Sequence, residues 1–369
     1  SSENNNTELQ ALTSIQGGGT VKREESDRNL MYDESNLSNY KMVRKDDFIV
    51  HLRSFEGGLE KSLLDGIISP AYHTFHSDVA DSRFYYPYFR SHEFIKHKLV
   101  PHVYGIRDGR SIDIAGMKTI EIAYTSIEEQ RKIGDYLESL DHLITLHQRK
   151  CEEMKTLKKY MLQKMFPQNG QSVPQIRFSG FTEDWEQRKL GDVFEQTSNL
   201  VNPKEDEIEL WSLTVEDGLT KKSDRYNREF LVKKDDNFKE VRPGDIVYNP
   251  MNMTLGAVGY NGMAKSVAVS GYYTTMVAKE NYDTYYINTW LKSPQAIRLY
   301  RTYATGSLIE KQRVQFPTLS IIPVTFPKYE EQIKIGSYFH SLDNLITLHQ
   351  QKCDELRNIK KFMLQNMFI

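Results

Sequence analysis

Two histidine–cysteine pairs are the residues of this sequence that could bind a metal. His147 and Cys151 are four residues apart, and His349 and Cys353 repeat that spacing. Residues four apart share one face of a helix, so two crossing helices could offer zinc a site of two histidines and two cysteines. No Cys-x2-Cys pair accompanies them. We favour the alternative, in which these residues fix the register of a helical seam, and we predict no metal site.

Motifs of known catalytic sites are missing from the sequence. It contains no Gly-x4-Gly-Lys-Ser/Thr loop, no His-Glu-x2-His helix and no Gly-x-Ser-x-Gly elbow. Residues 249–252 (NPMN) lack the aromatic-terminated Asn-Pro-Pro motif with which amino-methyltransferases hold a flipped base. The acid pairs Asp46-Asp47 and Asp235-Asp236 stand next to lysine, which is typical of solvated turns. The sequence therefore predicts a non-enzymatic protein.

The composition indicates a globular protein of about two domains. The chain has 369 residues, of which 39% are hydrophobic and 27% charged, with a formal net charge of −2. No apolar run is long enough to cross a bilayer, so we expect no membrane partner. The two cysteines occupy the same position of a repeat and do not suggest a disulfide framework, which favours a cytoplasmic protein. Without an excess of basic residues, any contact with nucleic acid depends on local patches or on partner chains.

One long segment occurs twice. Residues 128–166 and 330–368 are identical at 26 of 39 positions, with a constant offset of 202. Their apolar residues recur in alternating steps of four and three, a heptad seam that Lys158 interrupts in the first copy. About 36 helical residues span roughly 54 Å. Two antiparallel copies would relate their attached domains by a pseudo-two-fold axis, which suits duplex DNA.

The apolar stripe of each copy is wider than one seam requires. Tyr136, Leu143 and Leu157 broaden it in the first copy. A helix that buries more than one face needs further helices, and we expect partner chains to supply them. The predicted partner-binding residues are Ile133, Leu137, Leu140, Ile144, Met154, Leu157, Ile335, Phe339, Leu342, Ile346, Leu356 and Ile359.

The segments between the helices have short alternating runs with turn residues, which predict strands. Examples are residues 244–248, 267–270 and 319–324, and residues 287–303 read as an amphipathic helix that Pro294 breaks or starts. We predict an α+β chain whose two mixed domains are separated by two long antiparallel helices in a pseudo-two-fold arrangement. The expected parts are 1–127 (first domain), 128–167 (first helix), 168–328 (second domain) and 329–369 (second helix).

The first domain repeats the second faintly. Residues 43–50 parallel 241–247, and the helix predicted at 85–100 parallels 286–303. The opening segment of the second domain, residues 173–198, has no counterpart in the first, so we expect the first domain to lack its N-terminal segment.

These features together resemble the specificity subunits of type I restriction-modification systems. The resemblance rests on residues 185–193 (WEQRKLGDV), on the motif Glu-Glu-Gln-x-Lys-Ile-Gly at 128–134 and 330–336, and on the domain–helix–domain–helix order. It covers nearly the whole chain. It implies that each domain is a target recognition domain that reads one half of a bipartite, asymmetric sequence in double-stranded DNA, and that the paired helices set the spacer.

The resemblance also implies partners and cofactors. The helices would dock two methylation subunits, which bind S-adenosylmethionine, and two restriction subunits would add ATP- and Mg-dependent cleavage. The chain itself would bind no cofactor. The alternative that we keep is a non-catalytic helical adaptor or dimerisation protein without a nucleic-acid ligand.

Candidate DNA contacts lie in loops that combine glycine with forked donors, amides or aromatic rings. Arginine and lysine read guanine, asparagine and glutamine read adenine, and hydroxyl groups contact phosphate. For each residue the alternative is an ordinary solvated loop. The predicted contacts are Arg53, Tyr72, His73, Arg107, Arg110, Ser111, Asn249, Asn252, Tyr272, Tyr273, Ser307, Lys311, Gln312 and Arg313.

Overall fold

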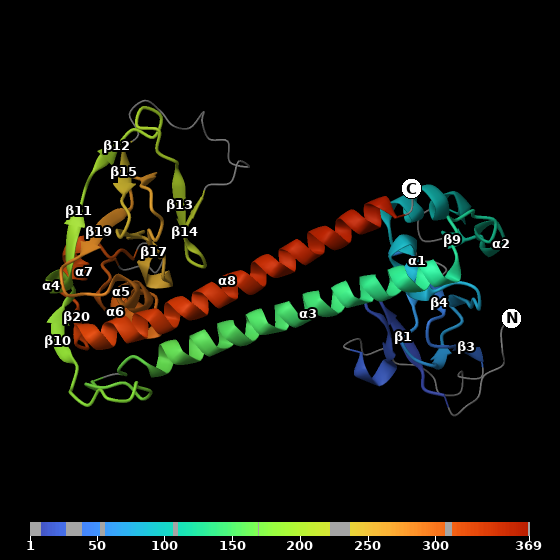
Figure 1. Cartoon of the computed structure of the whole chain (residues 1–369), viewed down its shortest axis with the longest axis horizontal. Coiled ribbons are helices and arrows are strands. Elements are labelled where there is room, and N and C mark those ends of the chain that lie inside the picture. Colours follow the sequence, from blue (N-terminus) through green and yellow to red (C-terminus); the bar gives the residue numbers. More distant parts are fainter. Residues whose placement is uncertain are drawn as a thin grey trace. The chain divides into compact units, whose positions relative to one another are not determined.

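The computed structural model describes residues 9–26, 39–51, 56–105, 110–168, 170–221, 237–306 and 312–367. Its contacts divide the chain into two compact units. Unit 1 comprises Ser1–Gln148 and Gln350–Ile369, and unit 2 comprises Arg149–His349. Each unit therefore holds one globular domain and parts of both long helices. The domains mix helices and sheets, which confirms the predicted α+β class (Figure 1).

The repeated segments form the two long helices. Helix α3 spans Ile127–Lys164 and helix α8 spans Tyr329–Asn366, with 38 residues each. Glutamates occupy the first turn of both, where a carboxylate is favoured by the helix dipole. Within each unit the local parts of α3 and α8 lie side by side (Figure 1). In the part of the chain that the structure describes, no helix is both long and apolar enough to span a membrane.

The described part of unit 2 contains antiparallel sheets packed on short helices. Strands follow the order β11-β19-β16-β17 in one sheet and β12-β15-β18 in another, and β13-β14 and β10-β20 form separate pairs. The strands are β10 (Glu186–Lys189), β11 (Phe194–Thr197), β12 (Leu200–Val201), β13 (Trp211–Thr214), β14 (Gly218–Lys221), β15 (Phe238–Val241), β16 (Ile246–Tyr248), β17 (Val258–Tyr260), β18 (Val267–Ser270), β19 (Thr274–Ala278) and β20 (Pro323–Phe326). The helices are α4 (Leu190–Val193), η8 (Met253–Leu255), α5 (Thr284–Leu291), α6 (Pro294–Tyr303) and α7 (Phe316–Ser320).

Capping residues explain where the helices of unit 2 begin. The side chain of Ser293 accepts a hydrogen bond from the backbone N–H of Ala296, and Pro294 fills the first position of α6. The helix predicted at 287–303 is therefore two helices, with Pro294 at the start of the second. The strand predicted at 319–324 is wrong in its first half, because Leu319 and Ser320 end α7. The strand predicted at 267–270 is confirmed.

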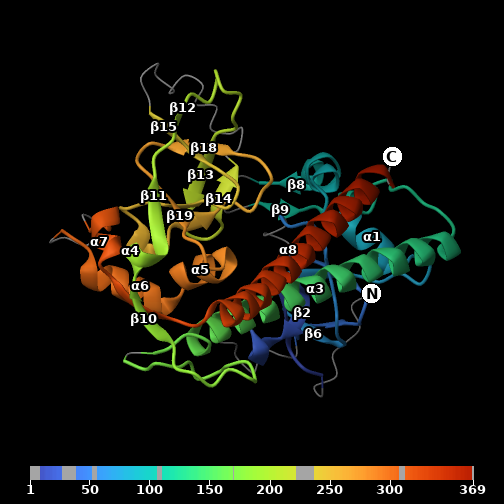
Figure 2. The same ribbon diagram turned by 60° about the vertical axis from the view of Figure 1, so that its left-hand side comes forward.

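The main core of unit 2 joins the domain to the long helices. Phe166 at the end of α3 and Phe339 on α8 stack with ring centroids 6.0 Å apart. Trp185, Tyr286 and Phe326 pack in the same cluster, and all five are buried. The elements α4, β11, β19 and α7 all contribute buried side chains to this core. Figure 2 shows α4 next to α7 and β11 next to β19.

The described part of unit 1 repeats this frame with fewer strands. Its pairings are β1-β2, β3-β6, β5-β4-β7 and β8-β9. The strands are β1 (Leu12–Ile15), β2 (Gly19–Lys22), β3 (Lys41–Val43), β4 (Phe48–His51), β5 (Glu60–Lys61), β6 (Gly66–Ile68), β7 (Tyr72–Phe75), β8 (Val103–Tyr104) and β9 (Ser111–Ile112). The helices are η1 (Arg23–Glu25), α1 (Ser82–Phe89), η3 (Phe94–Leu99), η4 (Val100–His102) and α2 (Ile114–Met117).

The single helix predicted at 85–100 is wrong. Asp81 caps α1 by accepting from the N–H of Arg83, so that helix begins earlier than predicted. It ends at Phe89, and a π-helix (η3) and a 3-10 turn (η4) follow. Phe94 and Leu99 of η3 are buried in the core of unit 1, so packing favours this irregular backbone over a continuous helix.

Candidate nucleic-acid interface

In unit 2, two predicted DNA-contact segments meet at one end of a sheet. Strand β16 pairs with β19 so that Tyr248 lies opposite Thr274. Tyr272–Tyr273 precede Thr274 and Asn249 follows Tyr248, so both segments leave the sheet at the same end. Tyr272 is 87% exposed, whereas Tyr273 packs against a cluster of buried valines. We call this end of each domain's sheet the loop end.

Unit 1 has the same arrangement with different residues. Strand β4 pairs with β7 so that His51 lies opposite Tyr72, and their rings meet edge to face with centroids 4.9 Å apart. His73 follows Tyr72 and is half-buried. Its ring lies next to that of Phe75, with the ring centroids 4.7 Å apart. Burial, together with the positive charge of Lys41, lowers the pKa of His73. At neutral pH this imidazole is therefore neutral and offers one donor and one acceptor.

A lysine supports the turn at each loop end. In unit 1 the ammonium group of Lys41 donates to the carbonyl of Tyr72 at 2.6 Å, and in unit 2 that of Lys239 donates to the carbonyl of Tyr273 at 2.7 Å. Burial lowers the pKa of both lysines. The sequence analysis did not predict these two lysines. Their equivalence could have been recognised, because each lysine stands two residues before the Val-Arg pair that both domains share.

The loop after β16 contacts a third predicted segment. The amide oxygen of Asn249 accepts from the N–H of Met251 at 3.0 Å, which commits that oxygen to the turn. Asn252 is exposed, and no side-chain hydrogen bond caps η8 from it. The N–H of Val314 donates to the carbonyl of Pro250 at 2.9 Å. Residues 312–314, which include Arg313, therefore lie against this loop. The structure thus brings Asn249, Asn252, Gln312 and Arg313 together at the loop end.

The corresponding segment of unit 1 contains Arg110 and Ser111. Ser111 on β9 lies opposite Tyr104 on β8. Arg110 is exposed and donates to the carboxylate of Glu56 at 2.9 Å, a contact that joins it to the loop after β4. Four predicted contacts lie outside the described residues: Arg53, Arg107, Ser307 and Lys311.

The predicted partner-binding residues of the helices differ in exposure. Leu157 and its repeat Ile359 are exposed, and Ile133, Met154 and Ile346 are half-buried. The other predicted residues are buried against the chain itself. In unit 1 these are Leu137, Leu140, Ile144 and Leu356, and in unit 2 they are Ile335, Phe339 and Leu342. Partner docking by this set stays a prediction.

The cysteines of the repeat sit inside the helix pair. In unit 2 the thiol of Cys151 lies 3.9 Å from the carbonyl oxygen of Ile346, and in unit 1 that of Cys353 lies 3.7 Å from the carbonyl oxygen of Ile144. Both side chains are buried. The described residues contain no group of three or more His, Cys, Asp or Glu side chains arranged to hold a metal.

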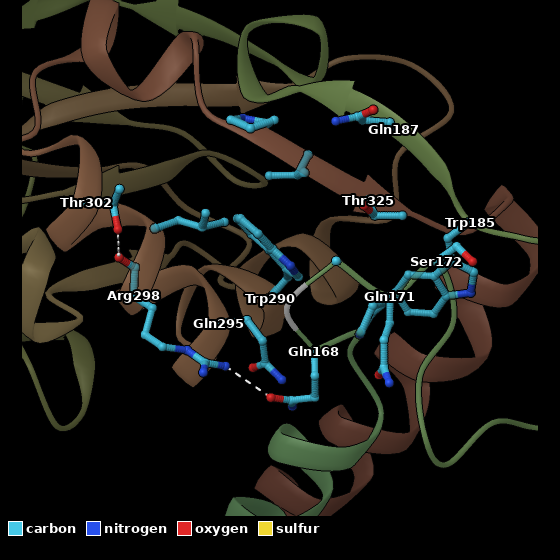
Figure 3. Close-up of a pocket in the computed structure, with 15 residues that line it drawn as sticks. Gln168, Gln171, Ser172, Trp185, Gln187, Trp290, Gln295, Arg298, Thr302 and Thr325 are labelled. Carbon is cyan, nitrogen blue, oxygen red and sulfur yellow. Dashed lines mark hydrogen bonds between the residues drawn. The ribbon is translucent and has the colours of Figure 1, made fainter.

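A polar cavity of about 660 Å³ lies beside α6 in unit 2. Arg298 donates across it to the amide oxygen of Gln168 at 3.1 Å (Figure 3). The amide nitrogen of Gln295 donates to the carbonyl of Phe166 at 3.4 Å, beneath the same cavity. These contacts tie the end of α3 to α6. No predicted site residue lines this cavity.

Comparison with known proteins relates the second half of the chain to a known domain family. Residues 182–358 match the model of the type I restriction modification DNA specificity domain. The type I restriction enzyme MjaX specificity subunit of Methanocaldococcus jannaschii is 23% identical over 277 residues, which cover 68% of this chain and 59% of that protein. The chain thus spans about three-fifths of the length of this curated relative.

A solved structure shows the same fold. The type I restriction-modification S subunit from M. genitalium superposes with a TM-score of 0.60 at 15% identity, covering 98% of this chain and 94% of that one. Two α+β domains, each followed by a copy of one long helix, make up this internally repeated fold. Residues 182–358 form a type I restriction modification DNA specificity domain, and the chain is similar to the specificity subunit of a type I restriction enzyme. This similarity does not favour the alternative of an adaptor without a nucleic-acid ligand.

Proposed function

We propose that the chain gives a type I restriction-modification complex its DNA specificity, and that each domain reads one half of a two-part target. The observation that carries this proposal is the pair of loop ends. Lys41 and Lys239 support them in the same way, yet the residues presented there differ. To read two different half-sites, two domains need the same fold but different exposed residues. Contacts to bases determine which sequence is bound, whereas the shared fold positions the domain on the DNA.

The chemistry of each loop end fits this role. Unit 2 presents three exposed side chains at its loop end. The Tyr272 ring can stack on a base, and the Asn252 amide can pair with adenine. The Arg313 guanidinium group can contact guanine or a phosphate. Unit 1 presents a neutral His73 and the exposed Arg110. The domains would therefore recognise different bases.

The exposed residues of the long helices support docking of two equal partners. Leu143, Leu157 and Tyr160 on α3 are exposed, and so are the corresponding Leu345, Ile359 and Phe362 on α8. Large exposed apolar residues repeated at equivalent positions fit two copies of one partner. We propose that these partners are two methylation subunits and that the helices set the spacer between the half-sites.

The remaining functions would belong to the partners. The methylation subunits would bind S-adenosylmethionine, and two restriction subunits would use ATP and Mg. Because the complex would act on host and invading DNA, we propose that it works in the cytoplasm.

Co-expression with a cognate methylation subunit, followed by mapping of modified adenines across the host genome, tests the proposal. We expect methylation at one asymmetric motif of two parts. Replacing residues 174–328 by those of a relative should change one half of the motif and leave the other unchanged. A complex that binds both methylation subunits but methylates no such motif would overturn the proposal.

The partner stoichiometry has its own test. Leu143→Asp and Leu345→Asp remove equivalent exposed side chains, one in each helix copy. Each single variant is expected to retain one methylation subunit and the double variant none, measured by native mass spectrometry. Loss of both subunits from either single variant would contradict docking at two equal sites.

A further inference from the structure

A basic groove of about 550 Å³ adjoins the polar cavity of unit 2. Its cations are Lys164 at the end of α3 and Arg298 and Arg301 on α6. The rest of its lining is uncharged and consists of Gln163, Gln168, Gln175, Pro294 and Ile297. The polar cavity shares Arg298 and Gln168 with this groove, and its lining also contains no aspartate or glutamate. The linings of both hollows therefore carry positive charge and no negative charge.

Uncharged acceptors hold the three cations of the groove. Figure 3 shows Arg298 reaching the amide oxygen of Gln168. The acceptors of Lys164, Arg298 and Arg301 are the amide oxygen of Gln175 at 2.7 Å, that of Gln168 at 3.1 Å and the backbone carbonyl of Thr254 at 3.3 Å, respectively. Such hydrogen bonds position a cation but leave its charge uncompensated. A groove lined in this way attracts an anion.

The basic groove lies beside the loop end of unit 2. Arg301 donates to the carbonyl of Thr254, which is two residues after Asn252. The residue two positions after α6 forms a bridge with Arg313. Arg298 lies one turn further from the loop end, about 4.5 Å along the helix axis at 1.5 Å per residue. The cations thus extend from the loop end along α6 towards the end of α3.

Unit 1 has a cation at the position that corresponds to Arg298. The hydroxyl groups of Ser91 and Ser293 each accept a hydrogen bond at 3.1 Å from the N–H three residues further on. Lys96 follows Ser91 by five residues, as Arg298 follows Ser293, and both cations are exposed. The residues at the loop ends differ between the units, whereas this charge is shared. A shared charge is expected of a contact that carries no base specificity.

We propose that the basic groove binds phosphate groups of double-stranded DNA next to the half-site that the loop end of unit 2 reads. This inference rests on the proposed function and adds a contact surface that none of the predicted DNA contacts includes. Lys164, Arg298 and Arg301 supply the charge. Because phosphates are the same in every sequence, the groove raises the affinity for cognate and non-cognate duplexes equally and leaves the methylated motif unchanged.

Arg298→Gln removes one charge from the groove and tests the proposal in the complex with the methylation subunits. Fluorescence anisotropy at several salt concentrations should show weaker binding to cognate and non-cognate duplexes. The slope of log K against log salt should fall by about 0.9, the value for one lost phosphate contact. Arg298→Lys keeps the charge and should keep the slope. On a duplex with uncharged methylphosphonates at the positions flanking this half-site, Arg298→Gln and the unaltered chain should bind equally.

Lys328→Ala is the matched control. Lys328 is an exposed cation of unit 2, but its ammonium group pairs with the carboxylate of Glu183 and lies outside the groove. Its removal should leave the slope unchanged. The proposal is overturned if Arg298→Gln keeps the slope of the unaltered complex, or if its loss of affinity persists on the methylphosphonate duplex.

Two further measurements separate this proposal from other outcomes. Native mass spectrometry should find both methylation subunits bound to the Arg298→Gln chain. Loss of these subunits would assign the groove to a carboxylate of a partner protein and overturn the proposal. Failure of the proposed function has a different signature, because the unaltered complex would then bind cognate and non-cognate duplexes with equal affinity.

Discussion

Lys158 and Asp343 form an ion pair between α3 and α8, with the ammonium nitrogen 2.5 Å from the carboxylate oxygen. Lys360 and Asp141 form the corresponding pair in unit 1. Lys158 is the residue that interrupts the apolar seam of the first helix copy. The lysine that interrupts the apolar seam therefore makes a specific contact with the other helix. Because the equivalent ion pair forms in both units, α3 and α8 pair in the same register in each unit.

Reversing one charge of this pair tests its contribution. Asp343→Lys places two ammonium groups together, and we expect it to lower the free energy of unfolding by about 1 kcal/mol, since the pair is partly exposed. The double variant Lys158→Asp/Asp343→Lys should recover about half of that loss. Urea unfolding measures both. A double variant less stable than either single variant would show that charge pairing does not fix this register.

Two buried glutamines attach the domains to the long helices. Gln332 accepts from the N–H of Asp283 at 3.1 Å and donates to the carbonyl of Pro327 at 2.9 Å. Gln130 makes the same contacts with Asp81 and Thr125 in unit 1. The Glu-Glu-Gln motif therefore connects each helix to the cap of the neighbouring domain helix.

Gln332→Leu should destabilise unit 2 by roughly 1–3 kcal/mol, because it leaves a backbone donor and an acceptor unpaired. Amide exchange at residues 283–287 should accelerate accordingly. Gln148→Leu, at an exposed position of α3, is the control and should change exchange little. Unchanged exchange in Gln332→Leu would exclude the glutamine as the attachment point.

An ion pair to a buried glutamate distinguishes the two units. Arg177 donates through two nitrogens to the carboxylate of Glu331, each at 2.8 Å, and Glu331 is 1% exposed. Its repeat Glu129 is exposed on the first turn of α3. We expect Glu331→Gln to cost about 1–3 kcal/mol, because it weakens two charged hydrogen bonds from the partly buried Arg177 to a buried side chain. Glu129→Gln should cost less than about 1 kcal/mol. Equal costs in thermal or urea unfolding would contradict this difference.

The sequence predicted the long helices and the α+β class because the repeat and its heptad spacing are local signals. It also indicated that Pro294 would break or start a helix. It did not predict the π-helix at Phe94–Leu99, which depends on packing within unit 1. Nor did it reveal Lys41 and Lys239, whose role depends on carbonyls about thirty residues away. Tertiary hydrogen bonds of this kind have no periodic signature.

The loop end of unit 2 makes a prediction about DNA binding. Under the proposed function, Asn252→Ala and Tyr272→Ala should each cost about 1–3 kcal/mol and relax specificity in one half-site. Arg313→Ala should mainly reduce the slope of log K against log salt by about one, if the guanidinium group contacts phosphate. Binding of the methylation complex to cognate and half-changed duplexes measures both. Asp217→Ala, on the hairpin turn of β13-β14, is the control and should not alter specificity.

His76 gives unit 1 a dependence on pH. Hydrogen bonds to Asp47 and Asp78 raise the pKa of His76 above its ordinary value. A raised pKa in the folded state means that the protonated form stabilises the fold. This contribution is complete below the unfolded pKa and is lost as pH rises through the folded pKa. Because His76 is 46% exposed, the contribution should stay below about 1 kcal/mol.

The stability of the chain should therefore fall slightly between about pH 5.5 and pH 8, a window that contains the ordinary histidine pKa of about 6.5. His76→Gln should remove this part of the dependence, and His97→Gln, whose ring is exposed beside Glu93, should leave it in place. Thermal unfolding of the three proteins at both pH values measures the difference. If His76→Gln follows the same pH profile as the unaltered chain, the Asp47–His76–Asp78 contacts do not stabilise unit 1.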